Sequence, residues 1–305
     1  MTAAFRDADY RLLPVMMSLL IVFFALKAYR WKLLLTPIER LTTWQVTPAM
    51  MIGFAFNNLL PAHLGEFVRV FVLGKQFGLP KTPVLSTVVL ERILDIIAIL
   101  SLLGFSLLFI DNMPPEAKQG SLIFAAISIC GVIMLGIYMA FTTQFVAFAD
   151  AILSRLKFVP EKIRTGVLEM LSTGAVGLEA VKDPKLLIPI ILTSFGQWIA
   201  NGLMIYFALR SFGVYVAVPH GFLVMGITAI GVTIPGPPGY FGIIQGCFKI
   251  SLGPLGYDQA KTFAGSIYYH MCQYIPVTLT GLAFLSKVGL SFGDVRREAQ
   301  QKKDE

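Results

Sequence analysis

The chain has 305 residues, of which 56% are hydrophobic and 14% charged, with a formal net charge of +7. Soluble domains carry about 25% charged residues, so this composition excludes an ordinary soluble domain and predicts an all-α polytopic integral membrane protein. The basic residues stand mostly between apolar segments, as the positive-inside rule expects, and no nucleic-acid-binding motif is present. We therefore expect no nucleic-acid partner.

Apolar runs of about 18 residues or more predict membrane-spanning helices. In chain order these runs cover about 12–29, 83–110, 120–142, 186–209 and 262–286. Two further apolar regions, about 48–79 and 219–253, are interrupted by helix breakers or ionisable residues. We predict a single transmembrane domain over 1–290, with about 5–7 spanning helices and two broken or re-entrant hairpins, followed by a tail at 291–305.

The segment 143–185 differs in composition, because it contains residues of both charges. Its apolar residues recur at roughly helical spacing, as in Phe148, Ile152 and Leu156. This pattern predicts amphipathic helices at the cytoplasmic membrane surface.

Charge distribution predicts the topology. Of the 25 Lys and Arg residues, 18 fall in four segments, 27–40, 69–81, 155–185 and 287–303. These segments should be cytoplasmic, which places the C-terminus inside and the protein in the plasma membrane. The two broken hairpins then enter the membrane from opposite faces. Opposite hairpins of this kind build the central site of inverted-repeat transporters.

The first broken hairpin holds a polar cluster made of Asn57, Asn58, Pro61, Gly65, Glu66 and Arg69. Pro61 and Gly65 should end one half-helix and open the next. Glu66 and Arg69 share a helix face at i,i+3 spacing and can pair. A half-helix N-terminus favours an anionic headgroup, and Arg69 can bind phosphate in a bidentate manner. The alternative is a structural ion pair with helix ends capped by Asn.

A second polar cluster contains Glu91, Arg92 and Asp95. Their spacing places Arg92 and Asp95, and also Glu91 and Asp95, on shared helix faces. Two acids with one base predict a local excess of negative charge, unless Arg69 balances it, and this excess permits proton coupling as a hypothesis. A surface-level salt bridge is the alternative.

The second broken hairpin contains Pro235, Gly236 and Gly239, followed by Gln245. Its Pro235-x-x-x-Gly239-x-Phe241 pattern matches Pro61-x-x-x-Gly65-x-Phe67, and this match suggests an inverted pseudo-repeat. Tyr269 and His270 in the last span either line a cavity or belong to the interfacial aromatic belt. Arg30-Trp31-Lys32 is interpreted as an inner-leaflet anchor.

These motifs together resemble the lysylphosphatidylglycerol synthase transmembrane family, the flippase-like domain of multiple peptide resistance factor proteins. The resemblance rests, in order, on Arg30-Trp31, Asn58-x-x-Pro61-x-x-x-Gly65-Glu66-x-x-Arg69, Glu91-Arg92-x-x-Asp95 and Pro235-Gly236-x-x-Gly239-x-x-Gly242. It implies a lipid translocase in which Asn58, Glu66, Arg69, Glu91, Arg92 and Asp95 line or brace the lipid path.

The chain departs from the family pattern at three points. His63 stands where the family usually has Arg, and Gln245 stands where it often has Glu. The family usually also has a helix before the Arg-Trp helix, and this helix is absent from the pattern. These departures put in doubt a phosphate-binding cation at 63 and acid chemistry at the second hairpin.

The leading hypothesis is a stand-alone flippase that moves an anionic, aminoacylated or polyprenyl-phosphate-linked lipid between leaflets. Its expected partners are membrane lipids with phosphate headgroups, with a homo-oligomer and a separate lipid-modifying enzyme left open. An integral-membrane transferase acting on polyprenyl-phosphate is the first alternative, and a non-catalytic scaffold is the second. The transferase alternative predicts a metal-binding DxD pair in a cytoplasmic loop, whereas Asp111, Asp150, Asp183 and Asp294 each stand alone. No HExxH, CxxC, P-loop or GxSxG motif occurs either, so we expect no cofactor, no metal and no enzymatic activity.

Overall fold

The computed structural model describes residues 2–60, 64–110, 141–155, 180–233 and 236–290, with isolated positions between 123 and 134, between 161 and 168, and at 293. All secondary structure in these residues is helical, as predicted. Pro61, His63, Pro235, most of the predicted span 120–142 and nearly all of the tail 291–305 lie outside the described residues. The predictions made for them stay predictions.

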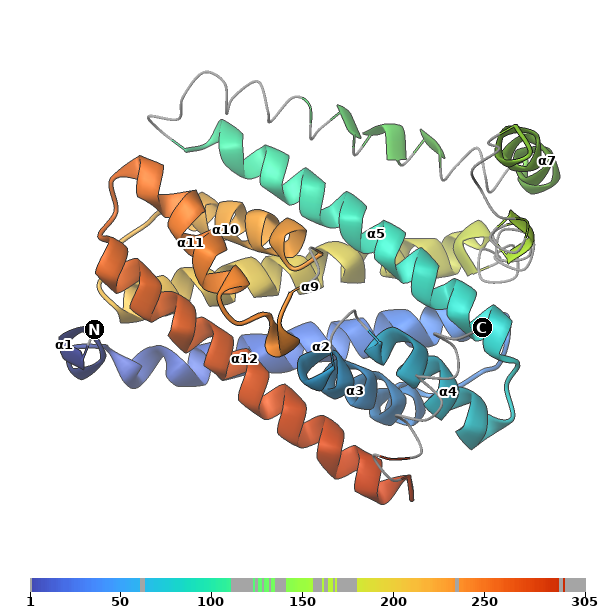
Figure 1. The fold of residues 1–305 in the computed structure, drawn as a ribbon, viewed down its shortest axis with the longest axis horizontal. Helices are drawn as coiled ribbons and strands as arrows, with labels where there is room; N and C mark the ends of the chain where they lie inside the picture. Colours follow the sequence, from blue (N-terminus) through green and yellow to red (C-terminus); the bar gives the residue numbers. More distant parts are fainter. Residues whose placement is uncertain are drawn as a thin grey trace.

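Four long helices form the frame of the molecule (Figure 1). They are α2 (Leu13–Leu35), α5 (Lys81–Leu108), α9 (Pro184–Ser211) and α12 (Gln259–Lys287). With 23 to 29 residues each, they reach about 35–44 Å at 1.5 Å per residue. The bounds agree with the predicted spans 12–29, 83–110, 186–209 and 262–286 to within a few residues, except that α2 continues six residues further.

Two regions of the described chain are both long and apolar enough to cross a membrane, Tyr10–Leu35 and Pro184–Ser211. The first combines the short helix η1 (Tyr10–Leu12) with α2. Helices α5 and α12 do not belong to this pair, because α5 contains charged residues and α12 is more polar. The expected total of 5–7 spans stays a prediction.

Helix ends follow local capping signals. Thr42 and Gln45 form a capping box at the start of α3 (Thr43–Leu59), where the Gln45 amide oxygen accepts from the Thr42 N–H at 2.8 Å. Asp183 and Asp258 accept N–H groups from the first turns of α9 and α12. These side chains satisfy donors that a helix N-terminus leaves without intrahelical partners.

The first broken region is a pair of packed helices, α3 and α4 (Gly65–Phe77). The second contains α10 (Val218–Gly231), the short helix η2 (Pro238–Tyr240) and α11 (Ile243–Leu252), and η3 (Gly253–Leu255) then leads to α12. The α-helices α3, α4, α10 and α11 have 10 to 17 residues, fewer than the about 20 needed to span a bilayer. Both regions are therefore broken as predicted, whereas their re-entrant course stays a prediction.

The two broken hairpins meet near the middle of the molecule. Their open ends lie at opposite ends of the bundle in Figure 1, and η2 contacts α3. Around them, α2 packs on α9, α3 on α12, and α10 on both α5 and α9. This arrangement brings residues far apart in the sequence to one central place.

Two short helices lie at the periphery, α1 (Thr2–Arg6) and α7 (Thr142–Leu153). Phe148 and Ile152 of α7 are exposed. An exposed apolar stripe on α7 agrees with the amphipathic character predicted for 143–185, most of which lies outside the described residues.

Candidate functional site: a charge network beside a polar cavity

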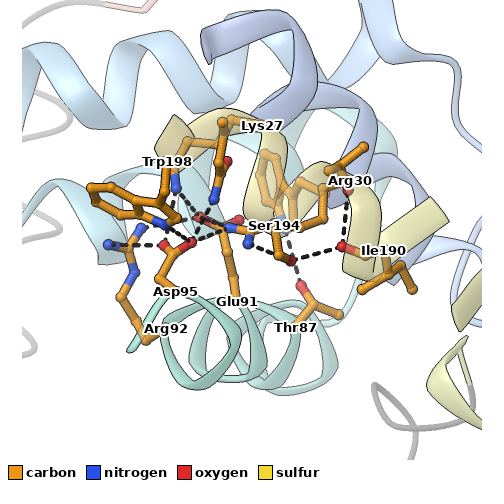
Figure 2. A network of polar contacts seen from close by, with 12 residues as sticks. Lys27, Arg30, Thr87, Glu91, Arg92, Asp95, Ile190, Ser194 and Trp198 are labelled. Atoms are coloured by element: carbon orange, nitrogen blue, oxygen red, sulfur yellow. Dashed lines mark hydrogen bonds and ion pairs between the residues drawn. The ribbon is translucent and has the colours of Figure 1, made fainter. Parts of the chain in front are cut away.

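Seven ionisable side chains from three helices form one connected set, which we call the charge network. Figure 2 shows its members on α2 and α5. The members of the network are Lys27 and Arg30 of α2, Glu66 and Arg69 of α4, and Glu91, Arg92 and Asp95 of α5. Helix α9 adds neutral donors. The predicted clusters 57–69 and 91–95 are therefore one site.

Glu91 is the centre of the charge network and is fully buried. Its carboxylate lies 3.1 Å from Lys27 Nζ, 3.2 Å from Arg69 Nη1 and 3.0 Å from Arg92 Nη2. Arg30 Nη2 is at 3.7 Å. All four cations of the network thus converge on one carboxylate.

Asp95 holds the other end of the network. It pairs with Arg30 at 2.7 Å and with Lys27 at 3.1 Å. The side chains of Gln197 and Trp198 on α9 donate to its Oδ1 at 2.6 and 2.9 Å. Because a buried charge is costly unless it is paired and hydrogen-bonded, these contacts fix α2, α5 and α9 relative to one another.

Glu66 and Arg69 pair at 3.1 Å, which confirms the i,i+3 prediction. Arg69 also balances Glu91, the possibility raised from the sequence, and its guanidinium stacks on Trp31 at 5.0 Å from the ring centroid. The pair is therefore part of a larger structure rather than an isolated salt bridge.

One interpretation of the sequence is corrected here. Arg30 and Trp31 are fully buried, so the inner-leaflet anchor is wrong for both. Four cations face three carboxylates in the network, and Arg69 contacts Glu91, so of the two possibilities raised for the second cluster the one in which Arg69 balances the charge is correct. The sequence alone could not show that α2 turns its basic residues toward α5 and away from the lipid interface.

The structure adds Lys27, Arg30, Gln197 and Trp198 to the predicted site residues. One signal for the first two was available, because Lys27 and Arg30 are three residues apart and so share a helix face, as Arg92 and Asp95 do. No comparable signal marks Gln197 or Trp198.

A cavity of about 210 Å³, which we call the polar cavity, lies beside the charge network. It is lined by side chains from both broken hairpins and from α2, α5, α9 and α12. Glu66 and Arg92 are the members of the charge network that reach it, and their side chains are 17% and 39% exposed. The side chains of the other five are 3% exposed or less. Glu66 and Arg92 are thus the accessible part of a network that is otherwise enclosed.

Asn57 and Asn58 line the cavity, but both also have structural roles. Asn57 Oδ1 accepts from the Gly65 N–H at 2.8 Å, and Asn58 Nδ2 donates to the Thr278 hydroxyl at 2.9 Å. Asn57 therefore caps α4, and Glu66 supplies an acidic group to its first turn. The capped-helix alternative is correct here, and the first N–H of this half-helix is not free for a ligand.

Tyr269 and His270 of α12 line the cavity with Gln273 and Tyr274. The Tyr269 hydroxyl donates to Asn201 Oδ1 at 3.1 Å and accepts from Gln273 Nε2 at 2.9 Å. Both residues are buried, so the cavity alternative is correct and the interfacial belt is wrong.

Gly236, Gly239 and Gln245 do not line the cavity, although Gly239 contacts Tyr274 and Gln245 contacts His270, which do. Gln245 Oε1 accepts from the Gly242 N–H at 2.8 Å, and its amide lies 3.2 Å from His270 Nδ1. Gln245 therefore caps α11 and orients His270. In the part of the chain that the structure describes, no group of three or more His, Cys, Asp or Glu side chains fits a metal ion.

The fold and the site define an all-helical integral membrane protein with a buried charge network beside a polar cavity. Residues 1–281 match the family model of the lysylphosphatidylglycerol synthase TM region, and the chain belongs to this family. This confirms the resemblance inferred from the motifs.

Two archaeal relatives match over most of their length. A UPF0104 membrane protein of Methanocaldococcus jannaschii is 27% identical, covering 74% of this chain and 90% of the relative. One from Methanothermobacter thermautotrophicus is 23% identical, covering 95% of this chain and 89% of the relative. A phosphatidylglycerol lysyltransferase of Bacillus subtilis is 34% identical over 107 residues, which are 35% of this chain and 12% of that protein. No solved structure matches the chain.

Proposed function

We propose that this protein is a lipid transporter that moves a lipid with a phosphate headgroup between the two leaflets. The headgroup passes through the polar cavity, and the tails stay in the hydrocarbon of the bilayer. The observation that carries the proposal is the partly exposed ion pair of Glu66 and Arg92, which lies on a cavity that both broken hairpins help to line.

The chemistry of this pair suits a phosphate. Arg92 Nη2 lies 3.4 Å from Glu66 and 3.0 Å from Glu91. A phosphate that enters the cavity can replace Glu66 as an acceptor, because a guanidinium donates in a fixed fork that fits phosphate. Glu66 is then available to a cationic group on the same headgroup. The site therefore favours an anionic phospholipid, or an aminoacylated one that a separate lipid-modifying enzyme would supply.

The buried part of the charge network has a different role. Lys27, Arg30, Glu91 and Asp95 hold α2, α5 and α9 in place. Opposite-facing broken hairpins around a fixed central site are the arrangement used for alternating access. We propose that the two hairpins alternately open the cavity to each leaflet, with the C-terminus on the cytoplasmic side.

The test is lipid exchange in proteoliposomes that contain fluorescent phosphatidylglycerol or fluorescent phosphatidylethanolamine. Wild type should exchange lipid faster than empty liposomes. Arg92→Gln should slow the exchange of both lipids by about tenfold or more, the effect of losing one charge-assisted contact. Glu66→Gln should slow mainly the lipid that carries an amine.

Matched controls are available in the exposed loop between α2 and α3. Glu39→Gln and Arg40→Gln make the same chemical changes at exposed positions and should leave exchange unchanged. Exchange no faster than in empty liposomes for every lipid would contradict the proposal. Turnover of a polyprenyl phosphate to a new product would support the transferase alternative. Evidence that the protein only stabilises a partner enzyme would support the scaffold alternative.

A further inference from the structure

A second cavity of about 480 Å³, which we call the apolar groove, lies between α2, α3 and α12. No ionisable side chain lines it, and its polar side chains are three threonines and a tryptophan. The Thr47 hydroxyl already donates to the Thr43 carbonyl at 2.7 Å. The groove therefore offers a hydrocarbon surface.

The apolar groove adjoins the polar cavity. Phe24 of α2 and Val277 of α12 line both. A molecule that occupies both spaces needs a polar end on one side of these two residues and an apolar end on the other. An amphiphile has this character.

The walls of the groove match one leaflet in length. Leu20–Ala28 of α2 and Thr43–Met51 of α3 border the groove, and each segment extends about 12 Å along its helix axis. The hydrocarbon of one leaflet is about 15 Å deep, half of the bilayer core. A polyprenyl chain, several times longer than one leaflet is deep, would leave most of its length outside.

The groove has an exposed border. Gly281 of α12 lies directly against Ala55 and Met51 of α3, and Met51 also lines the groove, so the two helices are in direct contact next to it. Ile21 and Trp44 on its borders are 69% and 82% exposed. A chain can therefore enter sideways from the bilayer, and Trp44 stands where an interfacial anchor is expected.

We propose that the apolar groove holds one acyl chain of a phospholipid whose headgroup occupies the polar cavity, with Phe24 and Val277 at the passage between them. The identity of the lipid as transported substrate rests on the proposed function. A second copy of the chain or a partner helix would also fill the groove. Neither occupant would explain why the groove adjoins a polar cavity.

The direct test is photocrosslinking with phosphatidylglycerol that carries a diazirine at the middle of one acyl chain, in vesicles that contain the wild-type protein. Labels should concentrate on peptides that contain 20–28, 43–51 and 276–284. Labels spread evenly over all lipid-facing helices would overturn the proposal.

The second test narrows the groove. Ala25 is exposed and lines it, so Ala25→Phe should fold but obstruct the chain. We expect groove labelling and lipid exchange to fall by about tenfold, the effect of a modest steric clash. Ala260→Phe, at an exposed position of α12 outside the groove, is the control and should change neither.

The two proposals can fail separately. Exchange that is fast in wild type and unchanged in Ala25→Phe would overturn the acyl-chain groove and leave the transporter in place. Specific groove labelling without any lipid exchange would keep the groove and remove the transporter. A shift of oligomeric state in Ala25→Phe, without groove labelling in wild type, would assign the groove to a second copy and overturn the proposal.

Discussion

The two broken hairpins look alike in sequence, but different forces hold them. The first, α3–α4, is fixed by Glu66 and Arg69 through the charge network and by close backbone packing. The second, α10–α11, has no Asp, Glu, Lys or Arg between 211 and 248. Its tip is held by a left-handed glycine, an amide cap and ring contacts. A shared Pro-x-x-x-Gly-x-Phe spacing therefore does not imply a shared local conformation.

The glycines show the difference most clearly. Gly65 begins α4, where a side chain would overlap the carbonyl oxygen of Gly53. Gly239 has φ +72°, a conformation that L-residues rarely adopt, and lies against Tyr274 and Phe241. One glycine is needed for close approach and the other for its backbone angle. The pseudo-repeat stays a prediction, and the two matched glycines differ in local geometry.

The strongest test of the comparison removes the centre of the charge network. Glu91→Gln leaves Lys27, Arg30, Arg69 and Arg92 without their common carboxylate. Breaking a buried ion pair costs about 3–5 kcal/mol, so we expect a loss of this size in unfolding free energy, measured in detergent. Glu39→Gln is the matched control, and a variant as stable as that control would show that the network does not hold the first hairpin.

Gly65→Ala tests the close packing of α3 on α4. Because the added methyl group would overlap backbone that cannot easily move, we expect destabilisation of about 3 kcal/mol, the upper end for overpacking. Gly246→Ala is the control, since open space surrounds that glycine and alanine favours a helix there. Equal stability of the two variants would contradict the observed packing.

Gly239→Ala tests the second hairpin in the same way. Forcing alanine into the left-handed region costs about 1–2 kcal/mol, and the Cβ would lie 2.8 Å from a Tyr274 ring carbon. We expect a smaller change in the thermal unfolding midpoint than for Gly65→Ala. A larger change for Gly239→Ala than for Gly65→Ala would contradict the expected order of the two hairpins.

The smallest effect is expected at the α11 cap. Gln245→Ala removes the acceptor for the Gly242 N–H, and loss of a cap costs about 1 kcal/mol. It also frees His270, whose imidazole NMR resonances should shift. Gln76→Ala, at an exposed position of α4, should change neither stability nor these resonances.

Much of the architecture was predictable because it depends on local chemistry. Apolar runs gave the bounds of α2, α5, α9 and α12, since burying hydrocarbon and satisfying backbone groups favour long helices. Helix breakers located the interruptions near 61–64 and 232–242. The i,i+3 spacing of Glu66 and Arg69 predicted their ion pair, because neighbours on a helix face are set by the helix itself.

Only the tertiary structure decided which distant residues share a site. Lys27 and Asp95 are 68 residues apart, and Gln197 is 102 residues beyond Asp95. Whether a basic residue on a helix faces lipid headgroups or a carboxylate depends on how that helix is rotated against its neighbours. Helix packing sets this rotation, and no pattern within one segment records it. The sequence therefore determined the helices and their polar residues, and packing determined that they enclose one charge network, one polar cavity and one apolar groove.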